Sequence, residues 1–204
     1  FNGAEPIRAA TLARFADRFA PCGFRREAFF PCYGLAEATL LVTGGPAGRV
    51  PVERTIDRAA LAEGRIAAPR TSAQTLIGCG SAAAGVELRI VDPEQRRACV
   101  EGQVGEIWLR GPSIAAGYHA QPEQTLATFA GRLVDDEPSD APTWLRTGDL
   151  GYCEDGELFV TGRRKDLIIV RGRNIYPQDV EATVEACHGA LRPGSSAAFM
   201  LDTD

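Results

Sequence analysis

An alternation of apolar and polar residues limits the folds open to this chain from residue 86 onward. Residues 86–90 follow it, residues 106–110 repeat it, and residues 152–160 carry Asp155-Gly156 between extended flanks, the usual composition of a tight hairpin turn. Because successive side chains of a strand point to opposite faces, a period of two indicates half-buried strands. We therefore expect an antiparallel β unit in this region.

Helical spacing marks the start of the chain. Apolar residues within positions 12–19 fall on one face of a helix, which Pro21 ends. Residues 29–33 predict a short apolar strand that runs into Gly34, and apolar residues within 35–42 share a helical face. The expected order is helix, strand, turn and second helix.

The composition changes between residues 46 and 74, where Pro, Arg, Ala and Gly become frequent. We interpret this segment as an insertion or a long surface loop. It contains one weak helical candidate, from Asp57 to Glu63, in which Asp57 occupies the N-cap position.

A new unit is expected to begin near Arg164. Residues 167–170 predict a strand and residues 171–174 its turn. Pro177 then opens a helix, and the early Asp179 suits the positive end of the helix dipole.

Composition and charge argue against several classes of partner. The 204 residues include 22 Lys and Arg against 27 Asp and Glu, a formal net charge of −5 without a run of like charges, so we expect no nucleic acid partner. The apolar runs have the length of strands, so we expect no stable membrane insertion. Six cysteines are scattered singly, which favours a reducing, cytoplasmic location.

Neither histidine predicts a dedicated metal site. His119 and His188 have no carboxylate or thiol at ligand spacing. The chain begins at Phe1 and ends on a polar segment at residues 201–204, and neither end has the character of a natural terminus. We therefore expect it to be a fragment of a longer protein.

The first candidate for chemistry is a carboxylate on a glycine turn, in Thr147-Gly148-Asp149. Such a carboxylate can accept hydrogen bonds from both vicinal hydroxyls of a ribose. An ordinary Asx turn has the same composition. Arg163 follows at a suitable distance and can donate to ribose or phosphate oxygens, so the ordered set favours a nucleotide site.

The second candidate is the run from Tyr33 to Glu37, which places an aromatic ring, a glycine and a carboxylate within one turn. The Tyr33 ring can stack on a flat base, and Gly34 allows close approach. Glu37 can hold Mg²⁺ between phosphates, because a hard cation prefers oxygen ligands. The alternative is a surface glutamate that complements the dipole of the expected helix.

These blocks, in this order, resemble the adenylate-forming enzymes. Residues 33–40 and 173–181 are most similar to the fatty acyl-AMP ligases, which commonly share Ala36 where many other members have Thr. The spacer between Glu37 and Gly78 is longer than acyl-CoA synthetases usually carry, and it resembles the insertion of the ligase branch.

The resemblance implies a role for each motif. The segment from Asn2 to Pro6 is similar to the one that contacts adenine, where small residues let the backbone approach a flat base. Glu37 would be the catalytic carboxylate and the Mg²⁺ ligand, and Lys165 would be the hinge about which a small C-terminal domain pivots between two half-reactions. The nucleotide-binding residues implied in this way are Gly3, Ala4, Glu5, Tyr33, Gly34, Asp149 and Arg163.

The resemblance also implies a mixed α/β fold in two parts. Residues 1–163 would be the C-terminal part of the large AMP-binding domain, with an α/β portion, a β-barrel-like portion and a ligase-type insertion at residues 46–75. Residues 164–204 would begin the small α+β C-terminal domain. The family's phosphate loop would precede Phe1 and its adenylation lysine would follow Asp204, so we expect this fragment to be inactive alone.

The implied function is the ATP-dependent, Mg²⁺-dependent activation of a fatty acid to acyl-AMP in lipid, polyketide or lipopeptide biosynthesis. The acyl group would pass to the phosphopantetheine thiol of an acyl carrier protein or of a polyketide synthase carrier domain. Two alternatives stay open. One is a long-chain acyl-CoA synthetase or another adenylation domain, and the other is a nucleotide-binding module without activity.

Overall fold

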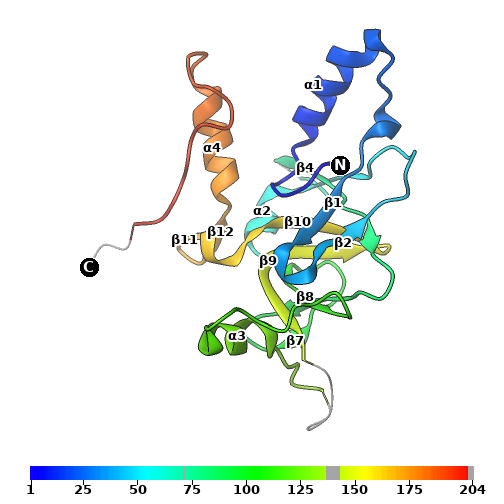
Figure 1. Ribbon diagram of the computed structural model, residues 1–204. Coiled ribbons are helices and arrows are strands. Elements are labelled where there is room, and N and C mark those ends of the chain that lie inside the picture. Colours follow the sequence, from blue (N-terminus) through cyan, green and yellow to red (C-terminus); the bar gives the residue numbers. More distant parts are fainter. Residues whose placement is uncertain (71, 137–142, 202–204) are drawn as a thin grey trace.

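The computed structural model describes residues 1–70, 72–136 and 143–201, and it has a β-rich centre with helices at its edges (Figure 1). The helices are α1 (Ala9–Phe19), α2 (Arg58–Ala62), α3 (Pro122–Phe129) and α4 (Pro177–Ala186). Strands of the first half are β1 (Cys32–Leu35), β2 (Leu40–Gly44), β3 (Glu53–Asp57), β4 (Ala73–Ile77), β5 (Ser81–Ala82) and β6 (Glu87–Asp92). Strands of the second half are β7 (Arg97–Ala98), β8 (Gly105–Arg110), β9 (Leu145–Glu154), β10 (Glu157–Arg163), β11 (Ile168–Val170) and β12 (Arg173–Ile175).

The predicted antiparallel unit is a five-stranded sheet with the order β10-β9-β8-β6-β7. Its neighbouring strands all pair antiparallel. The hairpin between β9 and β10 turns at Asp155 and Gly156, whose φ angles are 51° and 79°. Positive φ at both central residues is what a two-residue type I′ turn requires, so the predicted hairpin is confirmed.

The predicted helix at residues 35–42 is wrong. Residues 36–38 form one 3₁₀ turn, η3 (Ala36–Ala38), and the chain then returns as β2, antiparallel to β1. A Cβ atom on Gly34 would lie 1.7 Å from the carbonyl oxygen of Leu40, so only glycine permits this close approach. The helical spacing of the apolar residues was therefore overridden by packing between the two strands.

The segment at residues 46–74 is not an unstructured loop. Strands β3 and β4 pair antiparallel and enclose α2, and the Asp57 side chain caps that helix by accepting from the N–H of Ala60 at 2.9 Å. Ile56 and Leu61 are each 1% exposed and pack with Tyr176, which precedes α4. The weak helix prediction is confirmed, whereas the loop interpretation missed this packed unit.

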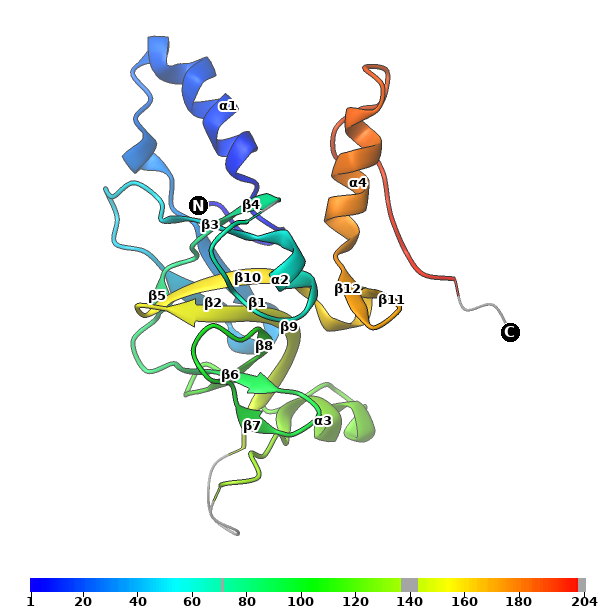
Figure 2. The same cartoon turned by 180° about the vertical axis from the view of Figure 1, so that it is seen from behind.

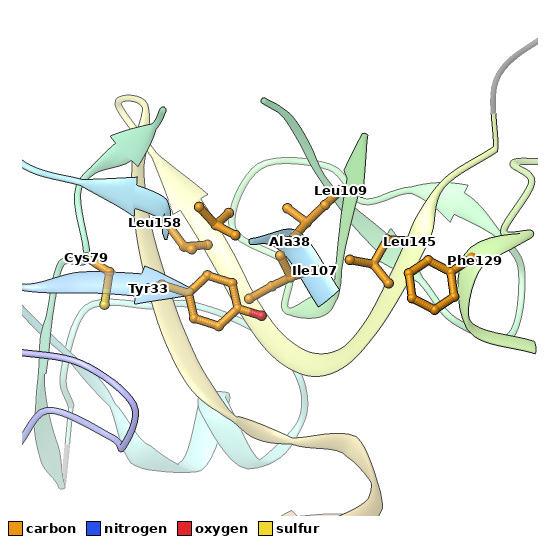
Figure 3. Close-up of a cluster of buried hydrophobic side chains, with 9 residues drawn as sticks. Tyr33, Ala38, Cys79, Ile107, Leu109, Phe129, Leu145 and Leu158 are labelled. Carbon is orange, nitrogen blue, oxygen red and sulfur yellow. The ribbon is translucent and has the colours of Figure 1, made fainter. Parts of the chain in front are cut away.

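The main core lies between the β1–β2 hairpin and the five-stranded sheet, as Figure 3 shows. Tyr33 projects from β1 toward Ile107 of β8, with Leu158 and Leu145 nearby. A second cluster on the other face contains Trp108 and Trp144. The core therefore joins the segment that carries Tyr33 to the strands that carry Asp149.

At the end of the chain the predicted strand and helix form, but Arg173 and Asn174 of the predicted turn belong to strand β12. A β11–β12 hairpin precedes α4, which stands beside the β-rich centre in both views (Figures 1 and 2). Two ion pairs join its acidic side chains to Arg8, which lies 3.9 Å from Glu181 and 3.5 Å from Glu185. Within the described residues, none of the helices is long and apolar enough to cross a membrane.

Candidate functional site

The centre of the candidate site is the carboxylate of Asp149, which is 6% exposed. The Tyr33 hydroxyl donates to its Oδ2 atom at 2.7 Å, and Nε of Arg163 donates to its Oδ1 atom at 3.0 Å. These two donors come from different sheets, since β1 belongs to the three-stranded sheet and β10 is the neighbour of β9 in the five-stranded sheet. A carboxylate has about four lone-pair sites, so both oxygens retain capacity for further donors.

Asp149 owes its direction to a bulge in β9. Along β8, Glu106 pairs with Leu150 and Trp108 with Arg146, so Ile107 alone faces residues 147–149. Bulges of this kind bend a strand and re-aim its side chains. The register therefore explains why Asp149 leaves the regular alternation of the strand.

Three hydrogen bonds brace this bulge. The Thr147 hydroxyl donates to the carbonyl of Ile107 at 2.7 Å, and the N–H of Asp149 donates to Thr147 Oγ1 at 3.1 Å. The N–H of Gly148 donates to Oε1 of Glu106 at 3.0 Å. Gly148 has φ 72°, a left-handed conformation that glycine adopts without strain. The turn is thus held by the side chain of its own Thr147 and by bonds to Glu106 and Ile107 of β8.

Burial keeps Tyr33 a donor. The desolvated position of its ring, followed by the neighbouring Asp149 carboxylate, raises the pKa of Tyr33 well above its usual range. The ring itself is 8% exposed and belongs to the core. Stacking of Tyr33 on adenine therefore stays a prediction, while its hydroxyl has a contact that the sequence did not indicate.

Arg163 faces outward from the same site. It is the register partner of Asp149 across the β9–β10 ladder, and its side chain is 57% exposed. Its Nε atom binds Asp149, so its two terminal nitrogens can still reach a ligand. This arrangement suits a guanidinium that contacts both the protein carboxylate and an added anion.

The segment from Asn2 to Glu5 lies alongside the start of β1. The N–H of Asn2 donates to the carbonyl of Phe30 at 2.8 Å, and the N–H of Cys32 donates to the carbonyl of Asn2 at 2.9 Å. Ala4 has φ 70°, and Gly3, Ala4 and Glu5 are exposed. Asn2 thus pairs with the residues just before Tyr33, and the predicted adenine-contacting residues Gly3, Ala4 and Glu5 follow it at the surface.

Glu37 lies in η3, beyond the end of β1, and is partly buried. The Tyr118 hydroxyl donates to its Oε1 atom at 2.6 Å, and its backbone carbonyl accepts from the N–H of Ala115 at 2.8 Å. The Thr39 hydroxyl also donates to the carbonyl of Ser113 at 2.6 Å. The loop before α3 therefore holds this turn in place.

The structure brings together most of the predicted residues. Asp149 is hydrogen-bonded to both Tyr33 and Arg163. Glu37 lies in the turn between β1, which carries Tyr33, and β2. Lys165 is exposed on the 3₁₀ turn η4 (Arg164–Asp166), between β10 and β11. A cavity of about 350 Å³ between α2 and α4 contains none of these residues.

Sequence reasoning missed two residues that contact the site. Glu106 falls in a strand predicted from its alternation alone, and no chemical role was predicted for Tyr118. Glu106 carried no usable signal, because the predicted alternation puts it on the face opposite Ile107 and Leu109, where a charged residue is expected. Tyr118 carried none, because its contact with Glu37 spans 81 residues of sequence.

Comparison with known proteins identifies the family. The family model described as AMP-binding enzyme matches residues 1–119. The chain belongs to this family. Its members are adenylate-forming, and within them this chain belongs with the fatty acyl-AMP ligases, so the predicted membership is confirmed.

Relatives in the family match nearly the whole chain. It is 46% identical over 206 residues to the medium-chain fatty acid–acyl carrier protein ligase JamA of Moorena producens, an alignment that covers 98% of this chain and 34% of that protein. It is 44% identical over 213 residues to the long-chain fatty acid–AMP ligase FadD32 of Mycolicibacterium smegmatis, covering 98% and 33%.

A solved structure agrees with this placement. A fatty acyl-adenylate ligase from L. pneumophila, crystallised in complex with acyl adenylate and pyrophosphate, superposes with a TM-score of 0.76 at 44% identity. The match covers 100% of this chain and 35% of that one. The chain thus spans about one third of the length of the relatives it matches.

Proposed function

We propose that the full-length protein carrying this chain uses ATP to convert a fatty acid into fatty acyl-AMP. In this reaction the fatty carboxylate attacks the α-phosphorus of ATP, and pyrophosphate leaves. Residues 1–163 would then be the end of the AMP-binding domain, and residues 164–204 the beginning of the small C-terminal domain.

The observation that carries this proposal is the pairing of Tyr33 and Arg163 with Asp149. A carboxylate held by two donors from separate elements has a fixed direction before any ligand arrives. Fixed acceptors suit the two vicinal hydroxyls of a ribose, because charge-assisted hydrogen bonds depend strongly on geometry. Such pre-organisation lowers the cost of aligning the nucleotide with an incoming carboxylate.

The nucleotide would lie over the hairpin that begins at Tyr33. Gly3, Ala4 and Glu5, which are exposed, would form the outer wall of its site, and Gly34 lies within the hairpin. Arg163 would place its free nitrogens against ribose or phosphate oxygens and neutralise part of their charge. In this arrangement residues 3–5 would lie at the adenine end of the nucleotide, and Arg163 would lie toward its phosphates.

Glu37 fits a magnesium ligand. Tyr118 occupies Oε1, which leaves Oε2 available. Among the described residues no cluster of three or more acidic, histidine or cysteine side chains could enclose a metal. Mg²⁺ suits such an open position, because proteins usually hold it by one or two carboxylates together with substrate phosphates. Bound there, the ion would supply charge neutralisation at the phosphates.

A carrier-protein thiol is the proposed acceptor of the acyl group. The similarity to a ligase named for acyl carrier protein supports this choice. The transfer would need the small domain to rotate, and Lys165 lies where the chain passes from β10 into β11. A residue at the end of an element can absorb the backbone rotation of such a hinge. Phosphopantetheine on a carrier protein or a polyketide synthase carrier domain would provide the thiol.

One substitution at Lys165 tests the hinge role, because loss of the hinge should affect only the second of the two half-reactions. We expect Lys165→Pro in the full-length protein to keep acyl-AMP synthesis and to suppress carrier acylation, because proline fixes φ at the pivot. Pyrophosphate release would follow the first step, and mass spectrometry of the carrier would follow the second. Lys165→Ala is the matched control. Equal loss of both steps in Lys165→Pro would contradict a selective hinge.

The function itself is tested by product analysis on the full-length protein. Labelled fatty acids of graded length would be incubated with ATP, Mg²⁺, CoA and a phosphopantetheinylated carrier. Acyl-AMP and acyl-carrier without acyl-CoA would support the proposal. Abundant acyl-CoA would make the protein an acyl-CoA synthetase, and absence of any adenylate would favour a nucleotide-binding module without activity.

A further inference from the structure

Glu106 is a buried carboxylate that the proposed chemistry leaves without a role. It lies on β8 beneath the turn that carries Asp149, and its side chain is 3% exposed. Its Oε1 atom accepts the N–H of Gly148 at 3.0 Å. Its Oε2 atom lies 3.6 Å from the guanidinium of Arg146 and has no hydrogen bond within the described part of the chain.

A buried charge of this kind needs a reason, because burial of a carboxylate is costly unless it is hydrogen-bonded or paired. The contact with Arg146 is a weak reason, since its distance exceeds that of a hydrogen bond. The bond from Gly148 is the stronger one. It satisfies a backbone donor that the bulge removes from the regular register of β8 and β9.

Gly148 is the point at which the turn would relax. Its neighbours are tied by other bonds, since Thr147 binds the carbonyl of Ile107 and Asp149 binds Thr147. Gly148 itself has the widest range of backbone conformations of any residue type. A shift there would rotate the plane of the following peptide and with it the Asp149 side chain.

We infer that Glu106 is a positioning residue that sets the direction of the Asp149 carboxylate through the N–H of Gly148. The inference rests on the proposed function, in which Asp149 receives the ribose hydroxyls. It predicts that loss of Glu106 weakens recognition of the ribose specifically. A purely structural glutamate would instead affect all ligands of the site alike.

The test measures ribose recognition directly, as the ratio of the dissociation constants for 2′-deoxy-AMP and AMP in the full-length protein. Calorimetric titration gives both constants without any fatty acid. For a hydrogen bond to a charged group we expect a wild-type ratio of about tenfold, falling toward unity in Asp149→Ala. Glu106→Met, which keeps the chain length but removes the acceptor, should lower the ratio by about threefold or more.

Two variants separate the acceptor from other effects. Glu106→Gln keeps an oxygen that can accept from Gly148, and it should retain the wild-type ratio. Glu106→Asp keeps the charge but is one methylene shorter, and it should lower the ratio. Because Glu106→Asp adds no bulk, it serves as the second probe if Glu106→Met does not fold.

Glu157 provides the matched control. Its Oε1 atom accepts the N–H of Gly80 at 2.6 Å, so it also braces a glycine amide, in the turn before β5, but it lies at the opposite end of β10 from Arg163. Glu157→Met should lower the melting temperature and leave the nucleotide ratio unchanged. The control therefore shows what loss of a structural brace does by itself.

The outcomes divide cleanly. A lowered ratio in Glu106→Met and Glu106→Asp, with wild-type ratios in Glu106→Gln and Glu157→Met, supports the inference. An unchanged ratio in both Glu106→Met and Glu106→Asp overturns it, as does an equal weakening of both nucleotides. A wild-type ratio in Asp149→Ala would overturn the ribose assignment and the role of Glu106 with it, whether or not a fatty acid is activated.

Discussion

The two candidate carboxylates of this chain lie in opposite environments. Asp149 is 6% exposed, sits in a braced strand bulge and receives donors from Tyr33 and Arg163. Glu37 is partly exposed, sits in a single 3₁₀ turn and receives one side-chain donor, Tyr118. The first suits a ligand with fixed hydrogen-bond geometry, and the second suits a cation that brings most of its own ligands.

Because of this difference, substitutions at the two carboxylates should differ in their effects on nucleotide chemistry and on the stability of the fold. The partners of Asp149 belong to the core, so its loss should disturb the fold as well as the nucleotide site. Glu37 contacts a surface loop, so its loss should change chemistry and leave the fold nearly intact. Paired substitutions in the two regions therefore test whether the contrast is real.

The largest effect is expected from Asp149→Ala in the full-length protein. Removal of the acceptor of two ribose bonds should lower kcat/KM for ATP by roughly 100-fold. The Tyr33 hydroxyl would also lose its buried partner, which should cost about 1–3 kcal/mol of unfolding free energy. Pyrophosphate release and chemical denaturation measure the two quantities. Asp17→Ala, at an exposed position of α1 away from the site, is the control. Unchanged use of ATP would remove the ribose assignment.

Glu37→Gln should affect chemistry alone. We expect the adenylation rate to fall by about tenfold or more and the Mg²⁺ concentration for half-maximal rate to rise, because a neutral amide is a poorer ligand. The unfolding free energy should stay within about 0.5 kcal/mol of wild type, as for most surface substitutions. Titration with Mg²⁺ and denaturation provide the readouts. A large loss of stability would break the contrast with Asp149.

A matched pair of variants removes one tyrosine hydroxyl from each region. Tyr33→Phe deletes a buried bond to a charged group and should cost about 1.5–3 kcal/mol of unfolding free energy. Tyr118→Phe deletes a more exposed bond and should cost about 0.5–1 kcal/mol, while raising the Mg²⁺ requirement through a less ordered Glu37. Denaturation of both variants under one condition makes the comparison. Equal costs would show that the two environments do not differ energetically.

The last prediction is a pH dependence of stability, which has no effect near neutral pH and develops only in alkaline solution. Burial, with Asp149 as second cause, raises the pKa of Tyr33, so folding keeps a proton that the unfolded chain loses above its ordinary pKa of about 10. The contribution of Tyr33 to the unfolding free energy is therefore fully present below a pH of about 10. It is lost as the pH rises further, by at most about 1.4 kcal/mol per pH unit. Denaturation of wild type and Tyr33→Phe between neutral and strongly alkaline pH should show a shallower decline for the variant. Identical slopes would contradict the burial of that hydroxyl.

Local patterns predicted part of the fold. Alternation gave the positions of β6 and β8, and Asp155-Gly156 predicted the β9–β10 hairpin, because these signals lie within a few residues of the structure they determine. The helix at residues 35–42 failed for the opposite reason. Its apolar residues satisfy both periods, and contact between β1 and β2 decided in favour of a strand.

The candidate site divides in the same way. Motif order marked Tyr33, Asp149 and Arg163, and the structure brings them together across 116 residues of sequence. Glu106 and Tyr118 could not be assigned from their motifs, since the function of each depends on a partner in a different element. Similarly, the packing of Ile56 and Leu61 on Tyr176 turned an apparent loop into a packed unit.

By itself, the sequence determined the family, the positions of β6, β8 and the β9–β10 hairpin, and the carboxylates available for nucleotide chemistry. These properties depend on residue identity, local period and motif order. Tertiary structure alone decided that Asp149 is buried and doubly bonded while Glu37 stays open, and that Glu106 lies beneath the Asp149 turn. Such properties arise from register and packing between distant segments, which no short stretch of sequence contains.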